Sequence, residues 1–413
     1  MDTIQFGRRV AYWRTRRRLS QHSFAALMGK SVRWVQDLEG GHRQADPQLS
    51  IVQLAALRLG VSVDRLLHDP AVLCPSASEV EAVRAALHRH DVLTGWSGTC
   101  AEAAPVAAVR RALVHARDGF QAGHFAQLGA QLPALLVDAT RAAGHYEGEE
   151  RRQAFRLLSL TLELVEAAAV KWGDSELAVT AGQRAVAAAE RSEDPVIMAS
   201  AARHLADALT HHGQPQAAVE FATAAAGRLQ ADLLQCGADG LSVLGMLWLK
   251  ASMAQAAAAE ADDRQPAALA RAVPDLLDQA DEHAARLGTD DNRLWTAFGP
   301  TNVALYRVAA HVQLREGEQA LAVAADIPDA ALAGLPRERR AHLLTDRAHA
   351  ETQAGLRAEA VDTLLEAERL APEEVACRPR TKALVEDLRL LGTGNAGAEG
   401  RLRALAARCG LPR

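Results

Sequence analysis

The sequence predicts an all-α protein, and three observations lead to that prediction. The 413-residue chain is 49% hydrophobic but only 4% aromatic, and Ala, Leu and Arg dominate it, as in packed helices. Apolar residues recur at helical spacing along most of the chain. The length exceeds what one compact core holds, so we expect either several domains or an extended helical array.

Cysteine usage and hydropathy restrict the expected location. The five cysteines lie far apart and form no C-x-x-C pair, which excludes a disulfide framework and a zinc knuckle. The N-terminus lacks the pattern of a signal peptide, and the longest apolar stretch, 241–249, is shorter than the ~20 residues of a membrane helix. We therefore expect a soluble cytoplasmic protein with no membrane partner.

Charge is divided unevenly along the chain. Residues 1–70 hold eleven Lys and Arg against six Asp and Glu, a net charge of +5. Since the whole chain carries −5, residues 71–413 carry −10. A basic head on an acidic body indicates that only the head approaches a polyanion.

The basic head has the pattern of several short helices. Ser20 and Ser31 are placed to cap the second and third, and Gly29 ends the second. Two short helices around a tight glycine-containing turn are the geometry that lays a helix in the major groove of DNA. The expected helices cover residues 4–17, 20–28, 31–40, 46–59 and 62–67.

The head carries a family resemblance over residues 6–67. The matching residues are Phe6-Gly7, Arg14, Leu19-Ser20-Gln21, Ala25, Gly29, Ser31, Val35, Leu38-Glu39, Gly41, Arg43 and Gly60-Val61-Ser62-Val63-Asp64-Arg65-Leu66-Leu67. This set resembles the lambda-repressor-like, or XRE-type, helix-turn-helix family. The resemblance implies a five-helix DNA-binding head, with a domain boundary at residue 70.

By that resemblance, Gln21 binds a phosphate and the outward residues of the third helix face base edges. Arg33 is the residue best suited to read sequence, because a guanidinium can bond both major-groove acceptors of guanine. Gln36 serves an adenine or a phosphate. Trp34 contacts a thymine methyl or sugar, or packs on the second helix. The residues assigned to DNA are Gln21, Ser31, Val32, Arg33, Trp34, Gln36, Asp37, His42 and Arg43.

The resemblance also implies an internal ion pair and a dimer. Arg14 and Glu39 are expected to pair inside the head and to have a structural role. Because one helix-turn-helix reads few base pairs, such heads act as homodimers on half-sites ~34 Å apart, so double-stranded DNA with an inverted repeat is the expected partner.

Beyond a linker at 71–78, residues 79–413 are a series of amphipathic segments divided by glycines. Gly173 and Gly213 are 40 residues apart, and Gly317 and Gly355 are 38 apart. The segments 205–219 and 348–372 resemble tetratricopeptide repeats, in which Gly ends one helix and Ala lets the next pack closely. The resemblance implies an α-solenoid of helical hairpins with a long concave face; generic helical hairpins are the alternative.

The most distinctive part of the body is an aromatic cluster in residues 292–313. Trp295, Asn302 and Tyr306 are the candidate effector-binding residues, because an Asn and a Tyr one helical turn apart can grip amide groups. The alternative is a packed aromatic knot whose polar tips are satisfied internally. The effector itself is a peptide, a small molecule or a protein.

The sequence contains no motif typical of an enzyme active site. Gly29-Lys30-Ser31 lacks the strand and the first glycine of a phosphate loop, and the glycine pattern at 392–397 follows a helical segment. His204, His211 and His212 lack a metal-binding motif. We expect no catalytic residue, metal or cofactor, and no enzymatic activity.

Together the two resemblances imply a DNA-binding transcriptional regulator. Its helical-repeat body binds an effector and controls the binding of a dimer to its operator. The alternative is a protein–protein interaction scaffold that the head anchors to DNA, with no dissociable effector.

Overall fold

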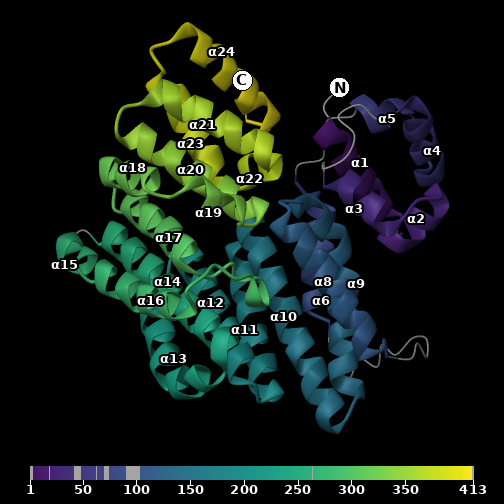
Figure 1. Cartoon of the computed structure of the whole chain (residues 1–413), viewed down its shortest axis with the longest axis horizontal. Coiled ribbons are helices and arrows are strands. Elements are labelled where there is room, and N and C mark those ends of the chain that lie inside the picture. The colour runs from purple at the N-terminus through teal and green to yellow at the C-terminus, as the bar shows by residue number, and fades with distance from the viewer. Residues whose placement is uncertain are drawn as a thin grey trace.

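The computed structural model describes residues 3–17, 19–40, 48–61, 63–68, 74–89, 103–262 and 264–411, and they form an all-α fold (Figure 1). No strand occurs among these residues; an isolated bridge between Asp291 and Phe298 is the one β-type contact. The prediction of an all-α chain is confirmed.

The head contains a helix at each of the five expected positions. The caps of α2 and α3 are confirmed, because the Ser20 and Ser31 hydroxyls accept from Ser23 N and Trp34 N. The fourth helix begins at Leu49, later than expected, and Asp46, Pro47 and Ser62 lie outside the described residues. The five helices are α1 (Thr3–Arg16), α2 (Gln21–Met28), α3 (Val32–Glu39), α4 (Leu49–Leu59) and α5 (Val63–His68).

The head has its own hydrophobic core. Phe6 and Val10 of α1 pack with Phe24 of α2 and Val35 and Leu38 of α3, and α4 and α5 complete the cluster. Gly7 lets α1 approach closely, because a Cβ at this position would collide with the Leu38 carbonyl. The apolar residues that recur at helical spacing in the head therefore pack into one small helical bundle.

The body begins with α6 (Ala77–Leu87), capped by a Ser76–Glu79 capping box, so the helix starts within the expected 71–78 linker. Residues 69–73 of that linker lie outside the described residues. The later helices are α8 (Val106–Gln121), α9 (Phe125–His145), α10 (Gly148–Trp172), α11 (Ser175–Ser192), α12 (Pro195–His211), α13 (Pro215–Gln235), α14 (Gly237–Ala261), α15 (Pro266–Ala270), α16 (Val273–Leu287), η1 (Arg293–Trp295), α17 (Pro300–Gln313), α18 (Gly317–Ala325), α19 (Asp329–Ala333), α20 (Arg337–Gln353), α21 (Arg357–Leu370), α22 (Pro372–Cys377), α23 (Pro379–Leu391) and α24 (Ala396–Arg408).

Glycines mark the ends of several body helices, as expected. Gly173, Gly213 and Gly355 adopt the left-handed conformation after α10, α12 and α20, where a side chain would be strained. Gly317 instead begins α18, and a Cβ there would lie 2.6 Å from the Ala350 carbonyl oxygen.

The helices of the body pack as successive pairs, and one member of each pair forms an inner row. The inner row is α8, α10, α12, α14, α17 and α20, each in contact with the next. Helix α20 also contacts α8, so the row curves back on itself. The curved row of inner helices therefore surrounds a central space.

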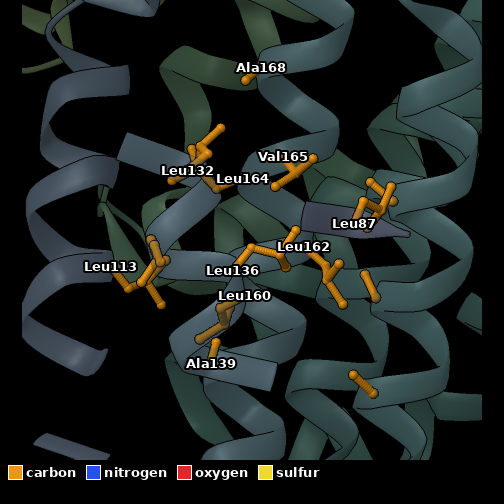
Figure 2. Packing of buried hydrophobic residues seen from close by; sticks show 14 of the residues in the cluster. Leu87, Leu113, Leu132, Leu136, Ala139, Leu160, Leu162, Leu164, Val165 and Ala168 are labelled. Carbon is orange, nitrogen blue, oxygen red and sulfur yellow. The ribbon is translucent and has the colours of Figure 1, made fainter. Parts of the chain in front are cut away.

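Apolar cores lie between the helix layers rather than in that central space. The largest cluster joins α6, α8, α9, α10 and α11, with a few residues of α12 and α22, and Figure 2 shows part of it, including Leu113, Leu136 and Leu164. Helix α14 is long and apolar enough to cross a membrane, but 72% of its apolar window is buried inside the protein, which is also typical of a core helix.

Candidate functional site

The turn between α2 and α3 brings together the residues predicted to face DNA. Gly29 ends α2 in the left-handed conformation (φ 63°), and Ser31 begins α3, so three residues separate the two helices. Because both caps satisfy backbone groups locally, the angle between the helices is fixed by the turn itself.

The outer face of α3 carries most of the predicted side chains. Arg33 and Gln36 are exposed, Val32 and Asp37 are half-buried, and the Ser31 cap is exposed. Trp34 is only 8% exposed and packs in the head core, so its predicted outward position is wrong and the packing alternative holds.

Gln21 is held within the head. Its side-chain amide donates to Glu39 Oε2 at 2.8 Å, which fixes the start of α2 against the end of α3. His42 and Arg43, also assigned to DNA, lie outside the described residues.

The expected Arg14–Glu39 pair is present. Arg14 Nε and Nη2 donate to the two Glu39 carboxylate oxygens at 2.6 and 2.9 Å, and Arg14 Nη1 donates to the Leu19 carbonyl at 2.7 Å. Arg14 is 2% exposed, so the pair joins α1 to α3 out of contact with water.

The head docks on the body through α1. Helix α1 packs against α9, and Arg337 of α20 donates to the Gly40 carbonyl at 2.6 Å. Burial raises the pKa of the Glu373 carboxyl to about 8, although Arg8 of α1 opposes the shift. Docking leaves Arg33 and Gln36 exposed, so the body does not cover this face of α3.

The inner row of the body encloses a cavity. Its empty space is about 1350 Å³, including the part open to solvent, and all six inner helices contribute to its wall. The centre of a water-sized sphere reaches about 160 Å³ of it, room for roughly ten water molecules or one compact ligand.

A segment that we call the strap, residues 289–299, joins α16 to α17 and contacts α8, and its Trp295 lines the cavity. Its Asn292 exchanges hydrogen bonds with Gln121 of α8, at 2.9 and 3.0 Å, and its Trp295 ring lies 5.2 Å from the Arg117 guanidinium carbon. Leu294, Trp295 and Ala297 have φ of 48°, 56° and 48°, values that L-residues rarely adopt. Backbone strain of this kind gathers at ligand sites and switches.

The cavity wall is strongly cationic. Three carboxylates accompany the cations, and two of them face a lysine: Asp207 lies 2.8 Å from Lys250, and Glu338 lies 2.6 Å from Lys171. Asp346 lies 3.6 Å from His342, whose pKa burial lowers well below its usual range. The lysines and arginines of the wall are Arg117, Lys171, Arg203, Lys250, Arg339, Arg378 and Arg380.

Tyr306 lies between two of these cations. Lys250 Nζ is 5.6 Å and the Arg339 guanidinium carbon 5.7 Å from the centroid of its ring. Burial raises the pKa of the Tyr306 hydroxyl, but Lys250 and Arg339 outweigh burial and lower it overall. The hydroxyl is therefore held in a positive field.

Two of the three predicted effector-binding residues reach the cavity. Trp295 and Tyr306 line it. Asn302 does not, because it is fully buried and its amide donates to the Thr296 carbonyl at 3.4 Å. Asn302 therefore packs internally, as in the packed-knot alternative, but its Oδ1 has no hydrogen-bond partner among the described residues, so its polar tip is only partly satisfied.

Glu338, His342 and Glu374 lie close enough together to hold a metal ion. Lys171 already occupies this cluster, with Nζ 2.6 Å from Glu338 and 2.8 Å from Glu374, and Arg378 lies 3.3 Å from Glu374. The carboxylates are thus neutralised by cations of the chain itself.

Sequence reasoning missed the carboxylates beside His204. His204 Nδ1 is hydrogen-bonded to Glu166, and His204 Nε2 lies 3.5 Å from Glu163. Burial lowers the pKa of His204 and raises that of Glu166. The available signal was two carboxylates inside an apolar helix, 157–170, which indicates buried charge rather than a solvated face.

No protein family model matches this chain, and no curated protein matches it. Function is therefore inferred from the residues and their geometry.

Proposed function

We propose that this protein is a sequence-specific DNA-binding transcriptional regulator, with a lambda-repressor-like head and a tetratricopeptide-like solenoid. In this proposal the body binds an effector in the central cavity and thereby controls how a homodimer binds an inverted-repeat operator. The proposal gives the protein no catalytic role and a cytoplasmic location.

The observation that carries the proposal is the exposed face of α3. Arg33 and Gln36 project from a helix whose other face is buried, and a three-residue turn joins that helix to α2. Arg and Gln at such positions bond to guanine and adenine edges in the major groove. The positive charge of residues 1–70 supports the approach to a polyanion.

The hairpin packing of the body supports the solenoid part of the proposal. Left-handed glycines end α10, α12 and α20, and buried alanines such as Ala181, Ala222 and Ala360 allow close packing of the next helix. A curved row of such hairpins presents its inner helices to a ligand.

Helix α22 offers a path from the cavity to the head. Glu374 bonds to Lys171 in the cavity wall, while the adjacent Glu373 accepts from Ala126 N, at the start of α9, at 2.8 Å. Helix α9 is the helix on which α1 docks. A ligand that favours one position of α22 can therefore shift the docking of the head by the difference in its affinity for the two states.

The first test is selection of the full-length protein on a random double-stranded DNA library at one fixed salt concentration. An inverted repeat with half-sites one helical turn apart supports the proposal, and Arg33→Ala is the matched variant that should lose the motif. If no motif is recovered from either protein, with or without cell extract, sequence-specific regulation is wrong and the scaffold alternative stands.

A further inference from the structure

We propose that the central cavity binds a compact organic anion: a carboxylate or phosphate group is held by Arg203, Arg339 and Tyr306, and an apolar body lies against Trp295. The proposal rests on the regulator function only for what the ligand does to DNA binding.

The charge of the wall supports an anionic ligand. Seven lysines and arginines line the described part of the cavity against three carboxylates. Asp207 and Glu338 are paired with lysines, and burial raises the pKa of the third, Asp346. Glu163 pairs with Arg117, Glu374 with Lys171 and Arg378, and Glu338 also lies 3.7 Å from Arg339. Arg203 and Arg380 form no ion pair among the described residues, so their charges have the capacity to bind a ligand.

Arg203 is the clearest of these cations. It is 4% exposed, its Nε forms no hydrogen bond, and it makes no ion pair within the part of the chain that is described. Burial lowers its pKa, the Glu163 and Tyr306 charges oppose that shift, and the Arg339 charge adds to it. Glu163 forms its ion pair with Arg117 and not with Arg203, so an anion next to Arg203 would supply the direct partner that this buried guanidinium lacks.

Arg380 is a second cation without an ion pair; burial lowers its pKa, and the Asp346 charge opposes that shift. Its Nη1 donates to the neutral Gln313 at 2.9 Å, and no ion pair to a carboxylate is formed among the described residues. Arg203 and Arg380 come from α12 and α23, so the positive wall extends across the cavity.

Tyr306 and its neighbours make a suitable anchor for the anionic group. The hydroxyl lies in the field of Lys250 and Arg339, and a hydroxyl donor beside a guanidinium matches the oxygens of a carboxylate or a phosphate. Arg203 lies close enough to Tyr306 for their charges to interact.

Part of the wall is apolar and suits a hydrophobic body. Trp295 presents its ring from the strap, with Phe120, Met253 and Leu305 from three different helices. A pocket with apolar walls and a few converging polar groups is typical of small-molecule sites. Convergence of the cations on one enclosed cavity favours a compact anion over an extended peptide, whose backbone is neutral.

The test uses a pair of fluorescent probes with the full-length protein and no DNA. 1-Anilinonaphthalene-8-sulfonate has an aromatic body and an anionic group, and N-phenyl-1-naphthylamine has the same body without the charge. We expect saturable one-site binding of the anionic probe, and binding of the neutral probe weaker by about tenfold or more, as for loss of a charge-assisted contact. Equal binding of the two probes would overturn the proposal.

Substitutions in the cavity wall test whether the anionic probe binds there. Arg203→Met and Tyr306→Phe should each raise the dissociation constant of the anionic probe about tenfold or more, whereas Arg228→Met, on the exposed surface of α13, should not change it. Circular dichroism checks that each variant is folded, and Tyr306→Phe keeps the ring if Arg203→Met does not fold. Unchanged binding in a folded Tyr306→Phe or Arg203→Met variant would refute the site.

A competition experiment shows whether the cavity prefers a carboxylate or a phosphate group. 1-Naphthoate and 1-naphthyl phosphate are added against the bound probe, and naphthalene methanol is the neutral control. Displacement by either anion supports the proposal and identifies the preferred group; displacement by neither, or equally by the alcohol, contradicts it. Since no DNA is present, failure of the operator selection leaves this result unaffected, and failure here leaves the DNA-binding proposal intact.

Discussion

The Arg14 guanidinium donates two parallel hydrogen bonds to the Glu39 carboxylate and so joins the first helix of the head to the end of the third. The pair is buried, so removing one partner leaves the other charge without compensation, at a cost of about 3–5 kcal/mol. We expect Arg14→Met and Glu39→Met each to lower the unfolding free energy of the head by that order. Denaturant unfolding followed by tryptophan fluorescence of the full chain measures the change.

The double variant is the control for this prediction. Replacing both partners removes both charges, so Arg14→Met with Glu39→Met should be more stable than the sum of the single changes implies. Strict additivity would mean that the pair contributes no coupling. Arg33→Ala, on the exposed face of α3, should change stability by less than about 0.5 kcal/mol.

Arg33 and Gln21 should affect DNA binding in different ways. Arg33 projects freely from α3, so Arg33→Ala is expected to relax the preference at one base pair of each half-site and cost about 1–3 kcal/mol. Gln21 bonds to Glu39 and lies at the start of α2, so Gln21→Ala should weaken all sequences alike. Titration of both variants on the selected operator and on single-base changes distinguishes the two patterns, and uniform loss for Arg33→Ala would contradict its role.

The local features of the head could be predicted because they depend on residues close in sequence. Ser20, Gly29 and Ser31 bond to backbone groups within a few positions, so the helix ends followed from residue type. The predicted outward position of Trp34 is wrong, although its spacing from Leu38 favours the buried face. Trp34 and Leu38 are four residues apart and share the buried face of α3, so core packing prevailed over the assigned outward face.

The cavity could not be predicted from the sequence. Its wall runs from Arg117 to Arg380, and it exists because α20 returns to contact α8. That closure is the sum of small rotations between successive helix pairs, which no local pattern encodes. In isolation, Lys171, Arg203 and Lys250 resemble ordinary solvated side chains on amphipathic helices.

Glu373 gives the protein a pH-dependent stability with a definite sign. Burial raises the pKa of its carboxyl to about 8, against 4.5 for an ordinary glutamate. Between these values the folded protein holds a proton that the unfolded chain has released. This carboxyl alone therefore makes the unfolding free energy fall as pH rises, by up to about 1.4 kcal/mol per pH unit, and the fall ends above pH 8.

The measurement compares the wild type with Glu373→Gln at each pH from 7 to 8. Buried His124, His204 and His342 have lowered pKa values and are neutral in the folded protein. Because an unfolded histidine still binds part of a proton near pH 7, each adds a small opposite slope that is common to both proteins. The Cys74 thiol, whose pKa is lowered to about 7 chiefly by its hydrogen bond with Cys377, adds an opposite slope to both proteins. The difference between the two proteins should change with pH, and a constant difference would contradict the buried protonated carboxyl.

Lys171 holds together a cluster that would otherwise be suited to a metal ion. Its ammonium lies between Glu338 and Glu374, with His342 beside them. Lys171→Ala leaves two buried carboxylates facing each other, and we expect a loss of stability of about 3–5 kcal/mol. Two carboxylates and an imidazole are also a ligand set that Zn²⁺ accepts, so added Zn²⁺ should raise the melting temperature of the variant by mass action.

The wild-type protein should show no comparable response, because Lys171 already neutralises these carboxylates. Adding Glu374→Gln to the Lys171→Ala variant removes one ligand and should abolish the response to Zn²⁺ while relieving part of the instability. If wild type and Lys171→Ala gain equally from Zn²⁺, the ion binds elsewhere and the ammonium does not exclude it. A gain confined to the single variant would instead show that one lysine decides between an ion-pair cluster and a metal site in the wall of the cavity.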